Sequence, residues 1–197
     1  MSTDADVVLL CVPERELAAA AALVPKGPLL GHCSASAPLS LLEPHERFSA
    51  HPLMTVTAAG ATFTGAACAV DGSSAHALDV AVGLATRLGM VPVRVPAEQR
   101  ALYHAAASLA SNFLVTLESA AEQLAQECGI ERAQLAPLVR AAVANWEAQG
   151  FAAITGPLAR GDEATVAAQR TAVAESAAEL LPLWDALTAR TRDMLRP

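Results

Sequence analysis

The sequence predicts an α/β region followed by an all-α region. Up to residue 95, short apolar and β-branched runs alternate with helical segments, which implies a mostly parallel sheet with helices on its faces. From Pro96 onward the β-branched runs end, and the rest of the chain has a helical pattern. The composition, 53% hydrophobic but only 4% aromatic, is typical of closely packed, alanine-rich helices. We therefore expect two domains, at residues 1–96 and 97–197.

The elements of the first domain follow from its apolar runs and turn residues. The run Val7–Val12 is continuous, apolar and rich in β-branched residues, and it ends at Pro13, which is typical of a buried parallel strand. Gly89 stands where a helix would end. The other expected strands are Leu29–Cys33, Phe48–Leu53, Cys68–Val70 and Val91–Val95, and the expected helices are Glu14–Val24 and Ser74–Leu88, with a helical turn at Leu39–Leu42.

The second domain is expected to open with one long helix, from Gln99 to Gly129, because Ala, Leu, Glu and Gln fill this stretch and Gly129 can end it. Asp162 is a candidate helix N-cap. The remaining expectations are a short turn or helix at Ile130–Leu135, a helix opened by Pro137 and running to Gln149, a loop at Ile154–Asp162, and helices at Glu163–Ala174 and Ala178–Leu195.

Charge and cysteine content exclude several classes of function. The net charge of −7, without a Lys/Arg cluster, argues against a nucleic-acid or anionic-membrane partner. The run Val7–Val12 is too short for a signal peptide or a membrane span, so we expect a cytoplasmic protein. The four cysteines have no metal-ligand spacing and are expected to be reduced and mostly buried: Cys11, Cys33, Cys68 and Cys128. We expect no metal site.

An uncharged polar stripe follows one face of the expected long helix. His104, Ser108 and Asn112 are four residues apart, with Ser111 beside them, so all share a face. Alanines at positions 105–107 and 110 allow another group to approach closely. Such a face suits a ligand cleft, although hydrogen bonding to a neighbouring helix is an alternative.

Three further candidates lie just past expected strand ends, where ligands bind in open α/β sheets. They are Pro13, Ser34 and His51. Each has a structural alternative: Pro13 as a strand terminator, Ser34 as a turn or cap residue, and His51 as a packed core histidine. Arg160, in the expected loop, can pair with a carboxylate or phosphate, or with Asp162 on the surface.

A glycine-rich phosphate-binding turn is absent from the sequence. A dinucleotide-binding sheet normally opens with a strand, a GxGxxG turn and a helix that receives the pyrophosphate. No GxGxxG occurs here, since Gly60, Gly65 and Gly72 are too far apart. The strand at Val7–Val12 therefore has the character of an inner strand.

Several motifs together resemble a bacterial family in which a Rossmann-like domain is joined to a helical C-terminal domain of unknown function. The motifs are His51-Pro52-Leu53, Tyr103-His104-Ala105-Ala106-Ala107 with Ala110-Ser111-Asn112, and Thr155-Gly156-Pro157 with Arg160-Gly161-Asp162. More distantly, the chain is similar to ketopantoate reductase, pyrroline-5-carboxylate reductase and the β-hydroxyacid dehydrogenases of the 6-phosphogluconate-dehydrogenase-like superfamily. This resemblance implies an incomplete Rossmann-like domain, with about sixty to seventy residues expected ahead of Val7, judging from usual βαβ lengths.

The resemblance also implies roles for the candidate residues. Val12 and Pro13 would lie along NADP or NAD, and Ser34 near its nicotinamide end. His51-Pro52 resembles the pair beside the reacting carbon in prephenate dehydrogenase-like enzymes. The Lys and Asn of the β-hydroxyacid dehydrogenases correspond here to Ser108 and Asn112. Because that lysine is missing, His104 or His51 would have to serve as acid/base.

The leading hypothesis is therefore an NAD(P)-dependent oxidoreductase that transfers a hydride to or from a small carbonyl, hydroxy or imine substrate. His104 or His51 would be the acid/base, with Ser108, Asn112, Ser111 and Arg160 contacting the substrate. The alternative is a non-catalytic binding or scaffold protein that forms a homodimer through the helical domain, as domains of this superfamily tend to do. A weaker alternative is an acid–base enzyme without a cofactor, using His51 and His104.

Overall fold

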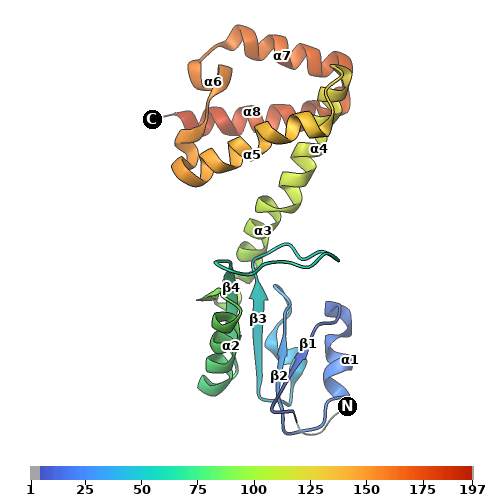
Figure 1. Cartoon of the computed structure of the whole chain (residues 1–197), viewed down its shortest axis with the longest axis vertical. Helices are drawn as coiled ribbons and strands as arrows, with labels where there is room; N and C mark the ends of the chain where they lie inside the picture. Colours follow the sequence, from blue (N-terminus) through green and yellow to red (C-terminus); the bar gives the residue numbers. More distant parts are fainter. Residues whose placement is uncertain (1–4, 197) are drawn as a thin grey trace. The chain divides into compact units, whose positions relative to one another are not determined.

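The computed structural model describes residues 5–196 and contains two compact units. The first unit extends through Asn112 and the second begins at Phe113. The first unit contains the sheet, and it also contains the 3-10 helix η3 (Ala97–Gln99) and helix α3 (Arg100–Ala110), which follow the sheet in the chain (Figure 1). Each unit is described here by itself.

The first unit is built on one five-stranded sheet with the order β1-β2-β3-β4-β5. All neighbouring strands are parallel except β3 and β4, so the predicted mostly parallel α/β fold is confirmed. The strands are β1 (Val7–Leu10), β2 (Leu29–His32), β3 (Arg47–Pro52), β4 (Ala67–Gly72) and β5 (Val91–Arg94), and the helices between them are η1 (Glu14–Glu16), α1 (Leu17–Ala22), η2 (Leu39–Leu42) and α2 (Ala75–Arg87).

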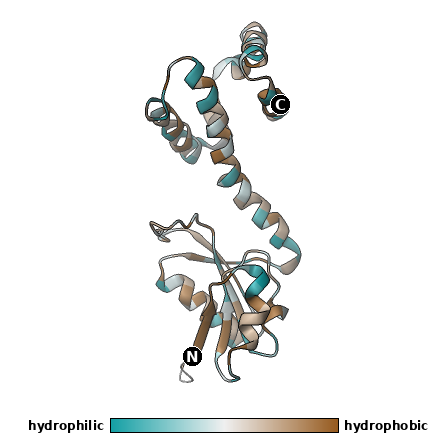
Figure 2. Ribbon diagram, turned by 90° about the vertical axis from the view of Figure 1, so that its right-hand side faces the viewer, coloured by the Kyte–Doolittle hydropathy of each residue, from teal (hydrophilic) through white to brown (hydrophobic). Residues whose placement is uncertain are grey.

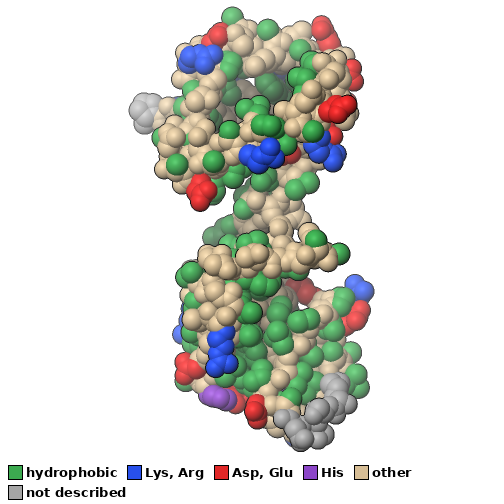
Figure 3. All heavy atoms as spheres, viewed as in Figure 1, with side chains coloured by type: hydrophobic (Ala, Val, Ile, Leu, Met, Phe, Trp, Pro, Cys, Tyr) green, Lys and Arg blue, Asp and Glu red, His purple; other side chains and the backbone are tan. Residues whose placement is uncertain are grey.

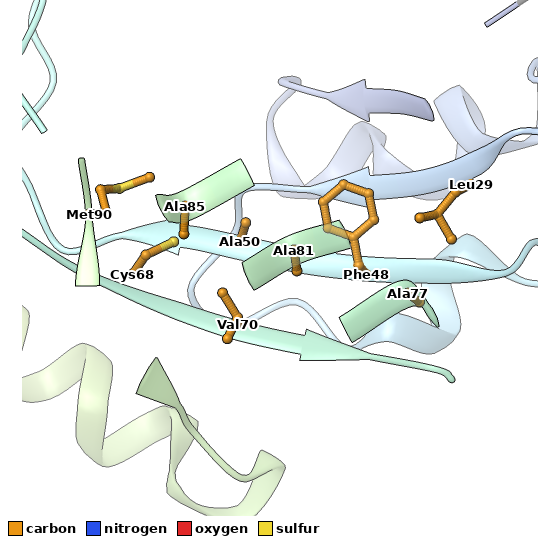
Figure 4. Close-up of a cluster of buried hydrophobic side chains, with 9 residues drawn as sticks. All are labelled: Leu29, Phe48, Ala50, Cys68, Val70, Ala77, Ala81, Ala85 and Met90. Carbon is orange, nitrogen blue, oxygen red and sulfur yellow. The ribbon is translucent and has the colours of Figure 1, made fainter. Parts of the chain in front are cut away.

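Small residues set the packing of α2 on the sheet. Ala77, Ala81 and Ala85 are four residues apart, fully buried, and lie against the β3–β4 side of the sheet (Figure 4). Alanine has no side chain beyond Cβ, so the helix lies close to the strands. Gly31 of β2 is paired with Phe48 of β3, and the Phe48 ring fills the space above this glycine. The core of the unit therefore depends on matched large and small residues.

Strand β1 differs from the expectation of a fully buried strand. It pairs with β2, and among the described residues it has no second neighbour. Val8 and Leu10 pack toward the cluster around Ala21 of α1, whereas Val7 and Leu9 are 41% and 37% exposed. The run is apolar throughout, as its colour near the N-terminus shows (Figure 2), but only one of its two faces is covered in this unit.

The predicted single helix over 99–129 is wrong, because the chain breaks at Ser111 into α3 and α4 (Asn112–Glu127). Ser111 has φ −125° and ψ −73°, outside the helical range. Its hydroxyl donates to the carbonyl of Ala107 at 2.8 Å, the same oxygen that accepts from the Ser111 backbone N–H. Serine that bonds back in this way competes with the helix ladder and bends it.

The second unit contains the other helices, α5 (Arg132–Gln149), η4 (Gly150–Ala153), α6 (Gly156–Arg160), α7 (Glu163–Ser176), η5 (Ala178–Leu180) and α8 (Leu181–Leu195). Two local expectations need correction. Helix α5 begins ahead of Pro137, at a capping box formed by Glu131 and Gln134, and the expected loop at 154–162 contains the short helix α6. The N-cap at Asp162 is confirmed, since its carboxylate accepts from the Thr165 N–H at 3.1 Å.

Exposed apolar side chains are common in the second unit, where few side chains are buried (Figure 3). Val115, Leu138 and Trp146 are each more than 60% exposed. All four cysteines of the chain are free thiols, but Cys11 and Cys128 are exposed, so the expectation of mostly buried cysteines is wrong. Across residues 5–196, no helix combines the length and apolar character needed to cross a membrane.

Gly31 provides a test of the packing in the first unit. A Cβ at this position would lie 2.3 Å from the Phe48 ring, which is completely buried. We therefore expect Gly31→Ala to lower the free energy of unfolding by about 1–3 kcal/mol, measured by urea denaturation. The control is Gly83→Ala in α2, where open space surrounds the new Cβ and helix propensity favours alanine. Equal stability of Gly31→Ala and the unchanged protein would contradict the packing described here.

Candidate functional site

A cavity of about 420 Å³ in the first unit brings together most of the predicted polar residues. Its walls are the chain that follows β3 and the exposed face of α3. The lining includes His51, His104, Ser108, Ser111 and Asn112. Leu53, Met54 and alanines of α3 form its apolar part. Residues about 50 positions apart in the chain thus share one cavity, with imidazole, hydroxyl and amide groups along it.

His51 lies within β3, paired with Ala69 of β4, and not beyond the strand end as expected. Its Nδ1 is 2.8 Å from the Tyr103 hydroxyl of α3. The two rings are nearly perpendicular, with centroids 5.6 Å apart, and the His104 ring centroid lies 6.4 Å from that of His51. The neighbouring residues Tyr103 and His104 therefore both flank the His51 imidazole.

The hydrogen bonds of Tyr103 allow two proton arrangements on His51. In one, the tyrosine O–H donates to Nδ1, and Nε2 carries the imidazole proton. In the other, Nδ1–H donates to the tyrosine oxygen. The tyrosine O–H then donates to the His51 carbonyl oxygen, with 3.4 Å between the two oxygen atoms. The first arrangement presents an acid at Nε2 and the second presents a base, so this pair can move one proton in either direction.

The surroundings keep both members of this pair uncharged near neutral pH. Burial lowers the pKa of His51, and the nearby His104 and Arg100 lower it further. Burial raises the pKa of Tyr103 to about 12. A neutral imidazole bonded to a protonated phenol is suited to proton transfer without a fixed charge on the protein.

A second group of polar residues lies at the carboxyl ends of β1 and β2. Glu14 accepts hydrogen bonds from the hydroxyls of Ser34 and Ser36, the latter at 2.7 Å. The Ser34 oxygen in turn accepts from the backbone N–H groups of Ser36 and Ala37. Bonding to Ser34, then to Ser36, lowers the pKa of Glu14. Ser34 thus has the capping role left open by the sequence, and Glu14 is a member of this group that sequence reasoning missed.

The remaining predicted residues are more exposed. Val12 is 37% exposed, and Pro13 immediately precedes η1. Arg160 is the last residue of α6 in the second unit and is exposed. Its charge makes a small contribution to the lowered pKa of Asp162, which arises first from the Thr165 hydrogen bond. In the described part of the chain, no three His, Cys, Asp or Glu side chains are placed to hold a metal ion.

A buried polar network beneath α3 was also missed by sequence reasoning. Arg100, only 7% exposed, donates to the Ser49 hydroxyl at 2.7 Å and lies 3.7 Å from the Asp71 carboxylate. His32 of β2 is paired with Ser49, so its side chain lies on the same face of the sheet. The sequence did not indicate that Arg100 is buried in a polar network, because its partners come from two separate strands.

His32 has no exposed surface, and its ionisation is strongly perturbed. Burial lowers the pKa of His32 to about 4, and the charge of Arg100 acts in the same direction. Nδ1 of His32 accepts from the Ser34 N–H at 3.2 Å, which leaves the ring proton on Nε2. His32 therefore binds the group at the ends of β1 and β2 through Ser34, and it shares a face of the sheet with Ser49 of the buried network.

Taken together, a mostly parallel sheet, a helical second unit and a polar cavity at the carboxyl end of β3 define a two-unit protein of the α/β plus all-α class. The chain belongs to the family described as Domain of unknown function (DUF2520), whose family model matches residues 66–191. The comparison with curated proteins found no match.

Two solved structures have a similar fold. Protein TM1727 from Thermotoga maritima superposes with a TM-score of 0.85 at 22% identity, over 96% of this chain and 79% of that one. The protein from Bacteroides fragilis named "putative NADP oxidoreductase BF3122" superposes with a TM-score of 0.79 at 20% identity, over 95% of this chain and 74% of that one. At these identities the similarity establishes a shared fold.

The pKa of His32 predicts how stability depends on pH. The unfolded chain binds a proton on this histidine near pH 6.5, whereas the folded chain binds it near pH 4. The unfolded state therefore holds more protons between these values, and stability falls as the pH decreases through this window. From pH 7 to pH 5 we expect a loss of about 2 kcal/mol, measured by urea unfolding. His32→Gln should weaken this pH dependence, and an unchanged slope in that variant would contradict the assignment.

Proposed function

We propose that this chain acts as an NADP- or NAD-dependent oxidoreductase on a small carbonyl, hydroxy or imine substrate. The observation that carries the proposal is the cavity in which His51, hydrogen-bonded to Tyr103, meets His104 and the polar face of α3. The fold shared with a protein named as a putative NADP oxidoreductase supports the same class of chemistry. In such an enzyme the nicotinamide supplies or accepts the hydride, and the protein positions and protonates the substrate.

The described residues fit the nicotinamide end of such a cofactor. In open α/β sheets the carboxyl ends of the strands face the ligand, and here these ends carry Val12, Pro13 and Ser34. The cavity lined by His51 lies at the carboxyl end of β3, which runs parallel to β2. The sequence contains no GxGxxG turn, so we assign no residue here to the pyrophosphate.

In this proposal His51 exchanges the proton that accompanies hydride transfer to or from a substrate oxygen or nitrogen. Tyr103 holds the imidazole in place and can form a hydrogen bond with either of its tautomers. His104 and Ser108 of α3 and Asn112 at the start of α4 form hydrogen bonds to the substrate. We retain Ser111 as a candidate substrate contact at this cavity and Arg160, by itself, as a residue suited to pairing with an anionic group.

The first test combines cofactor binding with substitutions in the cavity. NADPH and NADH are titrated by fluorescence, and hydride transfer is followed at 340 nm with small ketones, aldehydes and imines. His51→Ala and His104→Ala should each reduce turnover, by about 10²–10⁴-fold for the residue that is the acid/base. His76→Ala, an exposed histidine beside Glu46, is the matched control. Unchanged turnover in His51→Ala would refute its role as acid/base, and unchanged turnover in His104→Ala would refute its contact with the substrate.

We also propose that the helical unit pairs with a second copy of this chain. Large apolar side chains of this unit face solvent, with Leu138 and Trp146 of α5 and Val115 of α4 each more than 60% exposed. Exposed apolar groups at this density favour an interface with another protein surface. A non-catalytic homodimeric binding protein is the second candidate function, and it would be favoured by a dimer that binds neither NADPH nor NADH.

Sedimentation velocity tests the pairing. The unchanged chain should sediment as a dimer, and Trp146→Glu should shift it to a monomer because a charge is costly to bury in an apolar interface. The neighbouring exposed substitution Glu147→Gln is the control and should preserve the dimer. A monomer for the unchanged chain at micromolar concentration would overturn this proposal.

A further inference from the structure

Two cysteines lie side by side where the first two strands end. The parallel register of β1 and β2 places Leu10 beside His32, and the next residue in each chain segment is a cysteine, Cys11 or Cys33. Directly paired residues of parallel strands point to the same face of a sheet, and the strands are about 4.8 Å apart. This spacing lies within the range of Cα separations found in disulfides.

The surroundings of the two thiols differ. Cys11 is exposed, whereas Cys33 is half-buried. Burial raises the pKa of the Cys33 thiol to about 12, and the neighbouring Cys11 thiol contributes to this rise through its charge and hydrogen bonding. Cys11 is therefore the thiol that meets an oxidant in solution, and Cys33 is the nearest group able to react with the product.

We propose that Cys11 and Cys33 form a reversible intramolecular disulfide when the protein meets a peroxide. Cys11 Sγ attacks one peroxide oxygen, the O–O bond breaks and, with hydrogen peroxide, water leaves, so that a sulfenic acid forms on Cys11. Cys33 Sγ then attacks the Cys11 sulfur, and a second water leaves as the S–S bond forms. The two thiols lose two electrons and the peroxide gains them. A dithiol reductant reverses the reaction by thiol exchange.

The disulfide would act on the strand ends that carry the Glu14–Ser34 contact. Cys11 precedes Val12 and Pro13, and Cys33 precedes Ser34. Closing an S–S bond draws the two Cβ atoms together to about 3.8 Å. The strand ends shift as the two Cβ atoms approach each other. This shift changes the hydrogen bonds of Ser34 to Glu14 and to the following turn. This consequence for cofactor binding rests on the proposed function, whereas the disulfide itself does not.

Mass spectrometry of the full chain tests the disulfide directly. The reduced protein is treated with hydrogen peroxide, its free thiols are alkylated, and it is digested with trypsin, which cuts after Arg15, Lys26 and Arg47. We expect peptides 1–15 and 27–47 to be joined, with a mass about 2 Da below the sum of the two thiol peptides. The linked species should vanish in Cys11→Ser, a surface change, and in Cys33→Ser. It should persist in Cys128→Ser, where the other exposed cysteine is removed.

Other products would overturn the disulfide. They include Cys11 linked to another chain, Cys11 linked to Cys128, or both Cys11 and Cys33 still open to alkylation after peroxide has oxidised Cys128. NADPH titration then separates the two proposals. The oxidised chain should bind NADPH about threefold or more weakly than the reduced chain, and dithiothreitol should restore binding. Equal affinity would refute the effect on binding, whereas no NADPH binding in either state, with the disulfide present, would refute the proposed function alone.

Discussion

The contact on which the candidate site depends is the buried hydrogen bond from Arg100 to Ser49. Arg100 is the first residue of α3, and its guanidinium lies between Ser49 of β3 and Asp71 of β4. A hydrogen bond to a charged group contributes about 1.5–3 kcal/mol, and a buried charge left without its partner is far more costly. This contact therefore sets the rotation of α3 about its own axis, because Tyr103 and His104 follow Arg100 by three and four residues and face the same way.

The two-residue repeat of strand β3 and the helical repeat of α3 match at this contact. Ser49 and His51 are two residues apart on β3 and lie on one face of the sheet, while Arg100 and Tyr103 are three apart on α3. Each strand residue consequently has its own helix partner, Ser49 with Arg100 and His51 with Tyr103. The polar face of α3 then continues through Ser108 to the break at Ser111, which leaves this face lining the cavity.

The two units are stabilised in different ways. In the first, large and small residues are matched, as Phe48 is with Gly31, and most of the buried side chains of the chain lie here. In the second, α4, α6, α7 and α8 surround an apolar cavity of about 270 Å³ lined in part by Leu124, Val173 and Trp184. The helical unit buries few of its side chains, in agreement with its many exposed apolar groups.

Local patterns in the sequence determined the order of elements and the face of α3 that carries His104 and Ser108, because helix and strand periods are properties of neighbouring residues. The same patterns failed at Ser111, where a side chain competes for a backbone carbonyl. Sequence reasoning had His51 and His104 as candidates but not Tyr103 as the partner of His51.

Only the tertiary structure decided which distant residues meet. Arg100 with Ser49, His51 with Tyr103, Glu14 with Ser34, and Cys11 with Cys33 are pairs brought together by strand register and by the docking of a helix. Register depends on the burial of whole faces and not on any one residue, so no local pattern reports it. The sequence by itself thus determined the kinds of groups available to the site, and the packed sheet decided their partners, their burial and, through burial, their ionisation.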